Sequence, residues 1–152
     1  MLCSMLFVVS VATALFAPGC QRAPQPARGA LPPGQIEALE MYGSASELVL
    51  LVSVTEESLE RGTPPRKHAL HRKATVVRTY KGTWDVADAL SFYEAIEDVP
   101  PRFDGNDILR PQPSISLVLF LKTRPTTEVF IDTGRVWTYR SEMEPYLEKL
   151  SR

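Results

Sequence analysis

The sequence predicts a mainly β protein: a small antiparallel barrel, closed or half-open, with a short helix before it and a helix at the C-terminus. Apolar runs rich in Val and Leu recur between turn signals and predict about six strands. These runs do not alternate with helical patterns, which argues against a parallel βαβ sheet. The length of 152 residues, with 44% hydrophobic and 23% charged residues, suits one domain.

Two of the expected strands are central by composition. The segments 47–58 and 114–123 contain near-continuous apolar runs, which are typical of strands covered on both faces. A short helix is expected at 35–43, where Ile36 and Leu39 have helical spacing and Gly43 is a natural stop. The other expected elements are a polar strand at 67–80, a turn containing Gly82, a returning strand at 86–95, an irregular stretch at 96–113, a hairpin at 127–139 around residues 132–134, and a helix at 141–151.

The C-terminal helix has a start signal of its own. Ser141 is followed three residues later by Glu144, and this spacing predicts a capping box. Pro145 falls early in the same segment and is expected to delay the start of the helix.

The N-terminus has the pattern of a targeting segment. Residues 1–19 carry no charged side chain, and the apolar run 6–16 is shorter than the roughly 20 residues of a transmembrane helix. Its length is typical of the apolar region of a signal peptide. Residues 17–20, which end in Gly19 and Cys20, resemble the lipobox of bacterial lipoproteins. The resemblance implies a diacylglyceryl group on Cys20 and cleavage before it. Another type of signal or anchor, or a core helix, are the alternatives.

These features divide the chain into three parts: a signal peptide at 1–19, an acylated cysteine with a Pro-rich tether at 20–34, and a domain at 35–152. Proline-rich segments are extended, semi-rigid spacers. The chain's two cysteines, Cys3 and Cys20, both precede the domain, which therefore has no disulfide. The expected location is the cell envelope, lipid-anchored to a membrane. Gln21 after the acylated cysteine implies the outer membrane if the cell has two.

The region 45–122 resembles the netrin-module and tissue-inhibitor-of-metalloproteinase group, chiefly through the pieces "VVRTYKG" and "LVLFLK". The resemblance implies an OB-like β-barrel that serves binding rather than catalysis. In that group a free N-terminal cysteine contacts the zinc of the protease. Here Cys20 would be acylated and separated from the barrel, so protease inhibition is not inferred.

Charge is unevenly ordered along the chain. Residues 61–84 hold seven Lys or Arg and no acid, whereas residues 85–107 hold seven acids and one Arg. One interpretation is a basic binding surface. The other is that the two segments are arms of one hairpin whose opposite charges pair across the ladder. The candidate binding residues of the first interpretation are Arg66, Lys67, Arg72, Lys73, Arg78, Lys81 and Trp84.

Motifs for catalysis, metals and cofactors are not found. There is no Gly-x-Ser-x-Gly elbow and no phosphate-binding loop. His68 and His71 are three residues apart on an expected strand, where they would point to opposite faces. Neither a metal nor a cofactor is therefore expected. The acidic residues of 94–107 are the only candidates for hydrolytic chemistry: Glu94, Glu97, Asp98 and Asp104.

The sequence thus favours a membrane-anchored, non-enzymatic envelope lipoprotein whose domain binds a protein or glycan partner. The net charge of −1 gives no reason to expect nucleic acid. The alternatives are a small hydrolase that uses the acidic residues of 94–107, and a structural or assembly accessory lipoprotein.

Overall fold

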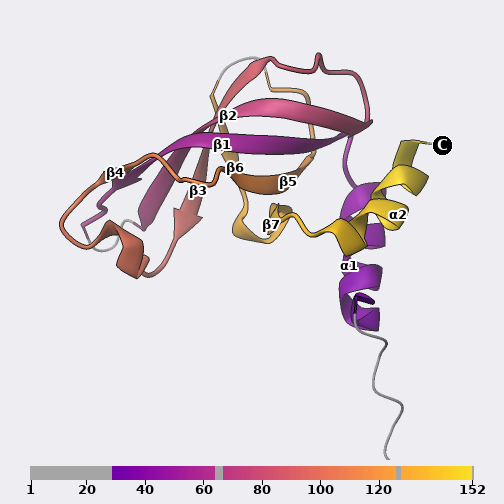
Figure 1. Cartoon of the computed structure of the whole chain (residues 1–152), viewed down its shortest axis with the longest axis horizontal. Helices are drawn as coiled ribbons and strands as arrows, with labels where there is room; N and C mark the ends of the chain where they lie inside the picture. Colours follow the sequence, from indigo (N-terminus) through magenta and orange to yellow (C-terminus); the bar gives the residue numbers. More distant parts are fainter. Residues whose placement is uncertain (1–28, 64–66, 126–127, 152) are drawn as a thin grey trace, which may run out of the picture.

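The computed structural model describes residues 29–63, 67–125 and 128–151, and this part of the chain is mainly β, as predicted. One sheet, in the order β6-β3-β2-β1-β5-β7 with β4 beside β1, curls into half of a barrel (Figure 1). The strands are β1 (Leu48–Glu60), β2 (His68–Lys81), β3 (Ala89–Ile96), β4 (Ile108–Leu109), β5 (Ile115–Leu121), β6 (Val129–Ile131) and β7 (Val136–Thr138). The helical elements are α1 (Pro33–Ser44), η1 (Pro101–Phe103), η2 (Thr133–Arg135), η3 (Ser141–Met143), α2 (Glu144–Leu147) and η4 (Glu148–Ser151).

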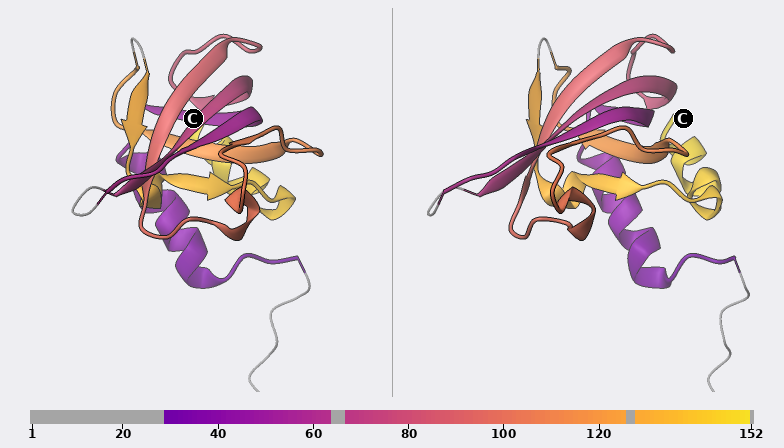
Figure 2. Two further views of the ribbon diagram at one scale, coloured as in Figure 1. Left: turned by 90° about the vertical axis from the view of Figure 1, so that its left-hand side faces the viewer. Right: turned by 60° about the vertical axis from the view of Figure 1, so that its left-hand side comes forward.

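The sheet is built around β1. This strand pairs antiparallel with β2 along one side, and with β5 and then β4 along the other. The β1–β2 ladder contains three register shifts, the last of them between Val54 and Glu56. Such irregularities bend a strand and increase its twist. The bend carries the far ends of β1 and β2 away from the helices (Figure 2).

The curl encloses the main core, and the helices cover a second one. On β1, alternate side chains point to opposite faces. Leu50, Val52 and Val54 enter the main core, while Val49 lies in the second core. The main core also takes Phe92 of β3, Leu119 of β5 and Ile131 of β6. The second core also takes Leu39 of α1, Phe120 of β5, Met143 of η3 and Leu147 of α2.

The stretch 96–113, expected to be irregular, contains two short elements. Phe103 of η1 is fully buried against Leu59 of β1 and Leu70 of β2, where it forms a third apolar cluster. β4 then pairs with the end of β1 through Ile108 and Leu109. The stretch is therefore fastened to the sheet at its middle and near its end.

The hairpin predicted at 127–139 is wrong. β6 is parallel to β3, β7 is antiparallel to β5, and the two strands lie at opposite ends of the sheet order. The 3₁₀ turn η2 joins them. The guanidinium of Arg135 donates hydrogen bonds to Ser46 Oγ (3.2 Å) and to the Phe120 carbonyl (3.4 Å), and it lies over the ring of Tyr42. These contacts hold the turn in place while the chain crosses from one edge strand to the other.

The capping box predicted at the C-terminal helix is also wrong. The segment 141–151 is divided into η3, one α-helical turn and η4, and no side chain caps its start. Glu144 instead accepts hydrogen bonds from the hydroxyls of Tyr80 (2.5 Å) and Tyr139 (2.9 Å), and it pairs with Arg78. The Glu144 carboxylate that the capping box would have used is thus bound by side chains of the barrel.

The first helix begins two residues earlier than expected, at Pro33, a residue type that is favourable in the first helical turn. Leu31, in the segment expected to be tether, is buried in the second core. Among the described residues, no helix has the length and apolar character needed to cross a bilayer.

The turn after β2 depends on a glycine. Gly82 has φ +80°, and a Cβ there would lie 2.7 Å from the Glu47 carbonyl oxygen and 2.9 Å from Leu48 Cδ1. We expect Gly82→Ala to lower the free energy of unfolding by about 1–3 kcal/mol, through backbone strain and the forced shift of a neighbouring strand. Chemical denaturation measures the change. Gly34→Ala is the control, because a Cβ at that helical position meets nothing within 4 Å. Equal stability of the two variants would contradict the expectation.

Candidate functional site

Four side chains form a row across the outer face of the sheet. Ser58 of β1 is paired with His71 of β2, His71 with Tyr93 of β3, and Tyr93 with Phe130 of β6. Residues at paired positions project to the same face of a sheet. The neighbouring positions on β2 and β3 point inward and are buried, so this row is on the outside of the half-barrel.

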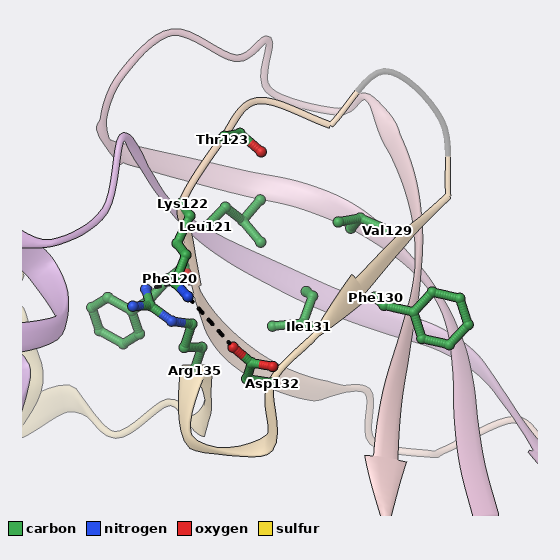
Figure 3. A pocket seen from close by; sticks show the side chains of 9 residues that line it. All are labelled: Phe120, Leu121, Lys122, Thr123, Val129, Phe130, Ile131, Asp132 and Arg135. Carbon is green, nitrogen blue, oxygen red and sulfur yellow. Dashed lines mark hydrogen bonds and ion pairs between the residues drawn. The ribbon is translucent and has the colours of Figure 1, made fainter. Parts of the chain in front are cut away.

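The three rings of this row are stacked. The centroids of His71 and Tyr93 are 4.4 Å apart at an interplanar angle of 15°, and those of Tyr93 and Phe130 are 4.9 Å apart at 19°. Phe130 is the end of the stack and is 76% exposed. Its ring points away from the hollow of about 210 Å³ between β5 and β6, into which Leu121 and Ile131 project (Figure 3). An aromatic surface at an edge strand is therefore open to solvent.

Carboxylates lie beside His71 and Tyr93 in the aromatic row. Glu128 Oε1 lies 3.5 Å from His71 Nε2, close enough for an ion pair when the ring is protonated. The other ring nitrogen, Nδ1, lies 3.5 Å from Ser58 Oγ. Partial burial raises the pKa of the Tyr93 phenol, and the nearby carboxylates of Glu128 and Glu60 raise it further. The row thus has an apolar stacking surface with negative charge beside it.

On the inner face, Arg72 belongs to a buried ionic network. Its Nε donates a hydrogen bond to Glu57 Oε1 (2.7 Å), and its Nη1 pairs with Glu94. Arg102 Nε donates to the other oxygen of Glu57 (3.1 Å). Burial alone would raise the pKa of Glu57, but the hydrogen bonds from the two guanidinium groups hold it below its usual value. Arg72 and Glu94, considered above for binding and for hydrolysis, are both used inside the fold.

The other basic residues of 61–84 that the structure describes also have partners. Two ion pairs bridge the basic and acidic segments at the surface, Arg61 with Asp107 and Lys67 with Glu97. The remaining partners come from other parts of the chain: Lys73 pairs with Glu56, Arg78 with Glu144 and Glu148, and Lys81 donates to the carbonyls of Gly43 and Ser44. Charge pairing across the hairpin therefore accounts for part of the charge order.

Trp84 packs against the main core, with the guanidinium of Arg124 5.3 Å from its ring centroid. The ring is thus used in packing against the main core. Arg66 and Cys20 lie outside the described residues.

The acidic candidates for hydrolysis are not gathered into one cluster. Glu94 faces inward to Arg72, whereas Glu97 and Asp98 line an open hollow beside Lys67. Asp104 is exposed in a different segment, after η1. Within residues 29–63, 67–125 and 128–151, no group of three His, Cys, Asp or Glu side chains is placed to hold a metal ion.

The aromatic row could not be found from the sequence, because its members come from four strands. Tyr93 and His71 were each visible on expected strands, but their contact depends on the β2–β3 register. Phe130 falls in the segment predicted as a hairpin, and its parallel pairing with β3 has no local signal. No protein-family model matches the chain, and no significant match to a curated protein was found.

The buried network makes Arg72 important for stability. Arg72→Ala would leave two buried carboxylates without their shared cation, and we expect it to lower the free energy of unfolding by about 3–5 kcal/mol. Lys73→Ala is the matched control, because its ion pair with Glu56 is 56% exposed on the lysine side. The control should cost less than about 1 kcal/mol in the same denaturation experiment. A similar cost for both variants would contradict a stabilising role for the buried network.

Proposed function

We propose that the protein is a lipid-anchored cell-envelope lipoprotein whose half-barrel is a non-enzymatic binding module for a protein or glycan partner. The stacked row of His71, Tyr93 and Phe130 supports the binding role, because its end ring is open to solvent at 76% exposure. Contiguous exposed apolar surface marks interaction sites more often than single exposed apolar residues do. The row therefore replaces the basic segment as the first surface to test.

The strand pairing supports the OB-like barrel that we propose for the domain. β1, β2 and β3 form an antiparallel meander, β3 is parallel to β6, and β1 is antiparallel to β5. An OB-fold is a partly open five-stranded barrel that binds ligands over its second and third strands. His71 and Tyr93 lie on the corresponding strands β2 and β3. The carboxylates of Glu60 and Glu128 beside the row would repel a polyanion, which disfavours nucleic acid.

The membrane anchor rests on the N-terminal sequence. Residues 17–20 have the lipobox pattern, and Cys20 follows an apolar run of signal-peptide length. One acyl chain anchors a protein only marginally, at about 0.8 kcal/mol for each buried methylene, so the two or three chains of a lipoprotein make a durable attachment.

Palmitate labelling tests the anchor. We expect Cys20→Ala to lose the label, because the thiol is the proposed acceptor of the lipid. Cys3→Ala should keep it, since that cysteine would be removed with the signal peptide. A labelled Cys20→Ala protein that still fractionates with membranes would refute the anchor.

Photo-crosslinking in the native cells tests the binding surface. A benzophenone amino acid at position 130 should give a discrete adduct with a protein or glycan, because the partner would lie against this ring. The same probe at position 86 is the control, since Val86 is also exposed, at 63%, but lies outside the row. The proposed surface fails if position 130 gives no adduct, or gives only the products seen from position 86.

A further inference from the structure

The two ring nitrogens of His71 have different neighbours on the outer face of the sheet. Ser58 of β1 and His71 of β2 are paired, so their side chains project to the same side. Ser58 Oγ lies 3.5 Å from Nδ1 of the ring, and Glu128 Oε1 lies 3.5 Å from Nε2. Activated nucleophiles have this order of groups, a hydroxyl, a base and a residue that orients the base, and their contacts are often looser before a substrate binds.

The carboxylate of Glu128 favours one tautomer of the imidazole. A neutral imidazole carries its proton on one nitrogen and accepts a hydrogen bond at the other. Nε2 is buried from solvent and forms no hydrogen bond with a described residue, and its ionic neighbour is Glu128. Because a carboxylate at neutral pH only accepts, it favours the tautomer with the proton on Nε2. The lone pair of Nδ1 then faces Ser58 Oγ, where it can take the hydroxyl proton.

The ring of His71 is held in place, and its neighbours stabilise the charge that it would acquire. His71 stacks on Tyr93 with 4.4 Å between the centroids, and its side chain is only 15% exposed. When the ring takes the serine proton it becomes a cation, which is attracted by the face of Tyr93 and by the Glu128 carboxylate. Both neighbours thus favour the charged form that arises as Ser58 reacts, and such a preference lowers the barrier to the reaction.

Ser58 can be reached from solvent. Its side chain is half-buried, and on the side away from His71 it is paired with Ile108 of β4, which is 58% exposed. Paired residues project to the same face of a sheet. An acyl donor with an apolar part can therefore rest against Ile108 while its carbonyl carbon approaches Ser58 Oγ.

We propose that Ser58 is an acylation site that takes the acyl group of an activated carboxylic ester, with His71 as its general base and Glu128 as the residue that positions the imidazole. Ser58 Oγ forms a bond to the carbonyl carbon, and the bond from that carbon to the leaving oxygen breaks. The hydroxyl proton passes to His71 Nδ1 and from there to the leaving group or to solvent. Each protein molecule takes one acyl group, so the step modifies the binding module and does not make it an enzyme.

Acetylation of the full-length protein in detergent micelles by p-nitrophenyl acetate tests the site. After an acid quench, we expect peptide mapping to find an acetyl group on Ser58, separate from any acetylated lysines. Ser58→Ala should lose this product. Ser91→Ala is the matched control and should keep the full rate, because Ser91 is a half-buried serine of β3 whose paired residue on β2 is Lys73 rather than a histidine.

A His71 variant separates base catalysis from structure. His71→Ala should slow the acetylation of Ser58 by about 10²-fold or more, which is the usual contribution of a general base. Added imidazole should restore part of the rate, because it supplies the missing base. Imidazole would not restore a rate that was lost through misfolding.

The positioning role of Glu128 has a spectroscopic test. At alkaline pH, where the ring is neutral, ring ¹⁵N shifts report which nitrogen of His71 carries the proton. Glu128→Ala should move the proton toward Nδ1, because the acceptor beside Nε2 is removed. Glu97→Ala is the matched control, an exposed glutamate paired with Lys67, and it should leave the tautomer unchanged. Both substituted side chains are more than half exposed, so both variants should retain the fold.

Three results would overturn the acylation site: no acetyl group on Ser58, equal rates for His71→Ala and the unsubstituted protein, or a slow His71→Ala variant that imidazole does not restore. An unchanged tautomer in Glu128→Ala would overturn the role of Glu128. The inference goes beyond the proposed binding function and does not depend on it. A discrete crosslink from position 130 alongside any of these results would leave the binding function standing and remove only the acylation site.

Discussion

The bend in β1 is the constraint on which the rest of the structure depends. This strand pairs along both sides, so its curvature is imposed on β2 and β5 at once. The register shifts let one strand serve two environments. Its first half separates the two apolar cores. Beyond the last shift, Glu57 points inward to Arg72 and Ser58 points outward to the aromatic row. The buried ionic network and the candidate site are thus opposite faces of the same bent segment.

The parts of the fold that the sequence predicts are those whose signals lie within the element itself. β1, β2, β5 and the turn at Gly82 were expected, because apolar runs and a glycine report on their own backbone. The hairpin prediction at 127–139 is wrong because Asp132 and Gly134 indicate a turn, but they carry no information about which strands the flanking segments pair with. The predicted capping box does not form, because Tyr80 and Arg78 of β2 and Tyr139, just after β7, bind the Glu144 carboxylate instead. A local hydrogen-bonding motif does not form where a tertiary partner binds the same side chain.

The candidate site shows the same limit. Charge order along the sequence indicates a basic surface at 61–84, but the described basic residues there have carboxylate or carbonyl partners within the fold. The informative surface consists of single residues from β1, β2, β3 and β6, and no spacing rule connects them. Finding it required the cross-strand register, above all the parallel pairing that sets Phe130 beside Tyr93.

The chain crosses from β6 to β7 through η2, and this connection affects how readily the protein can self-associate. An edge strand presents unpaired N–H and C=O groups that can recruit another chain into the sheet. Here both terminal strands of the sheet order, Val129–Ile131 and Val136–Thr138, are only three residues long. The turn between them ties the two edges together, with Arg135 anchored to the Phe120 carbonyl. Neighbouring molecules on the same membrane would therefore find few unpaired backbone groups at these two edges. Edge-to-edge pairing of half-barrels into a continuous sheet is disfavoured for this reason.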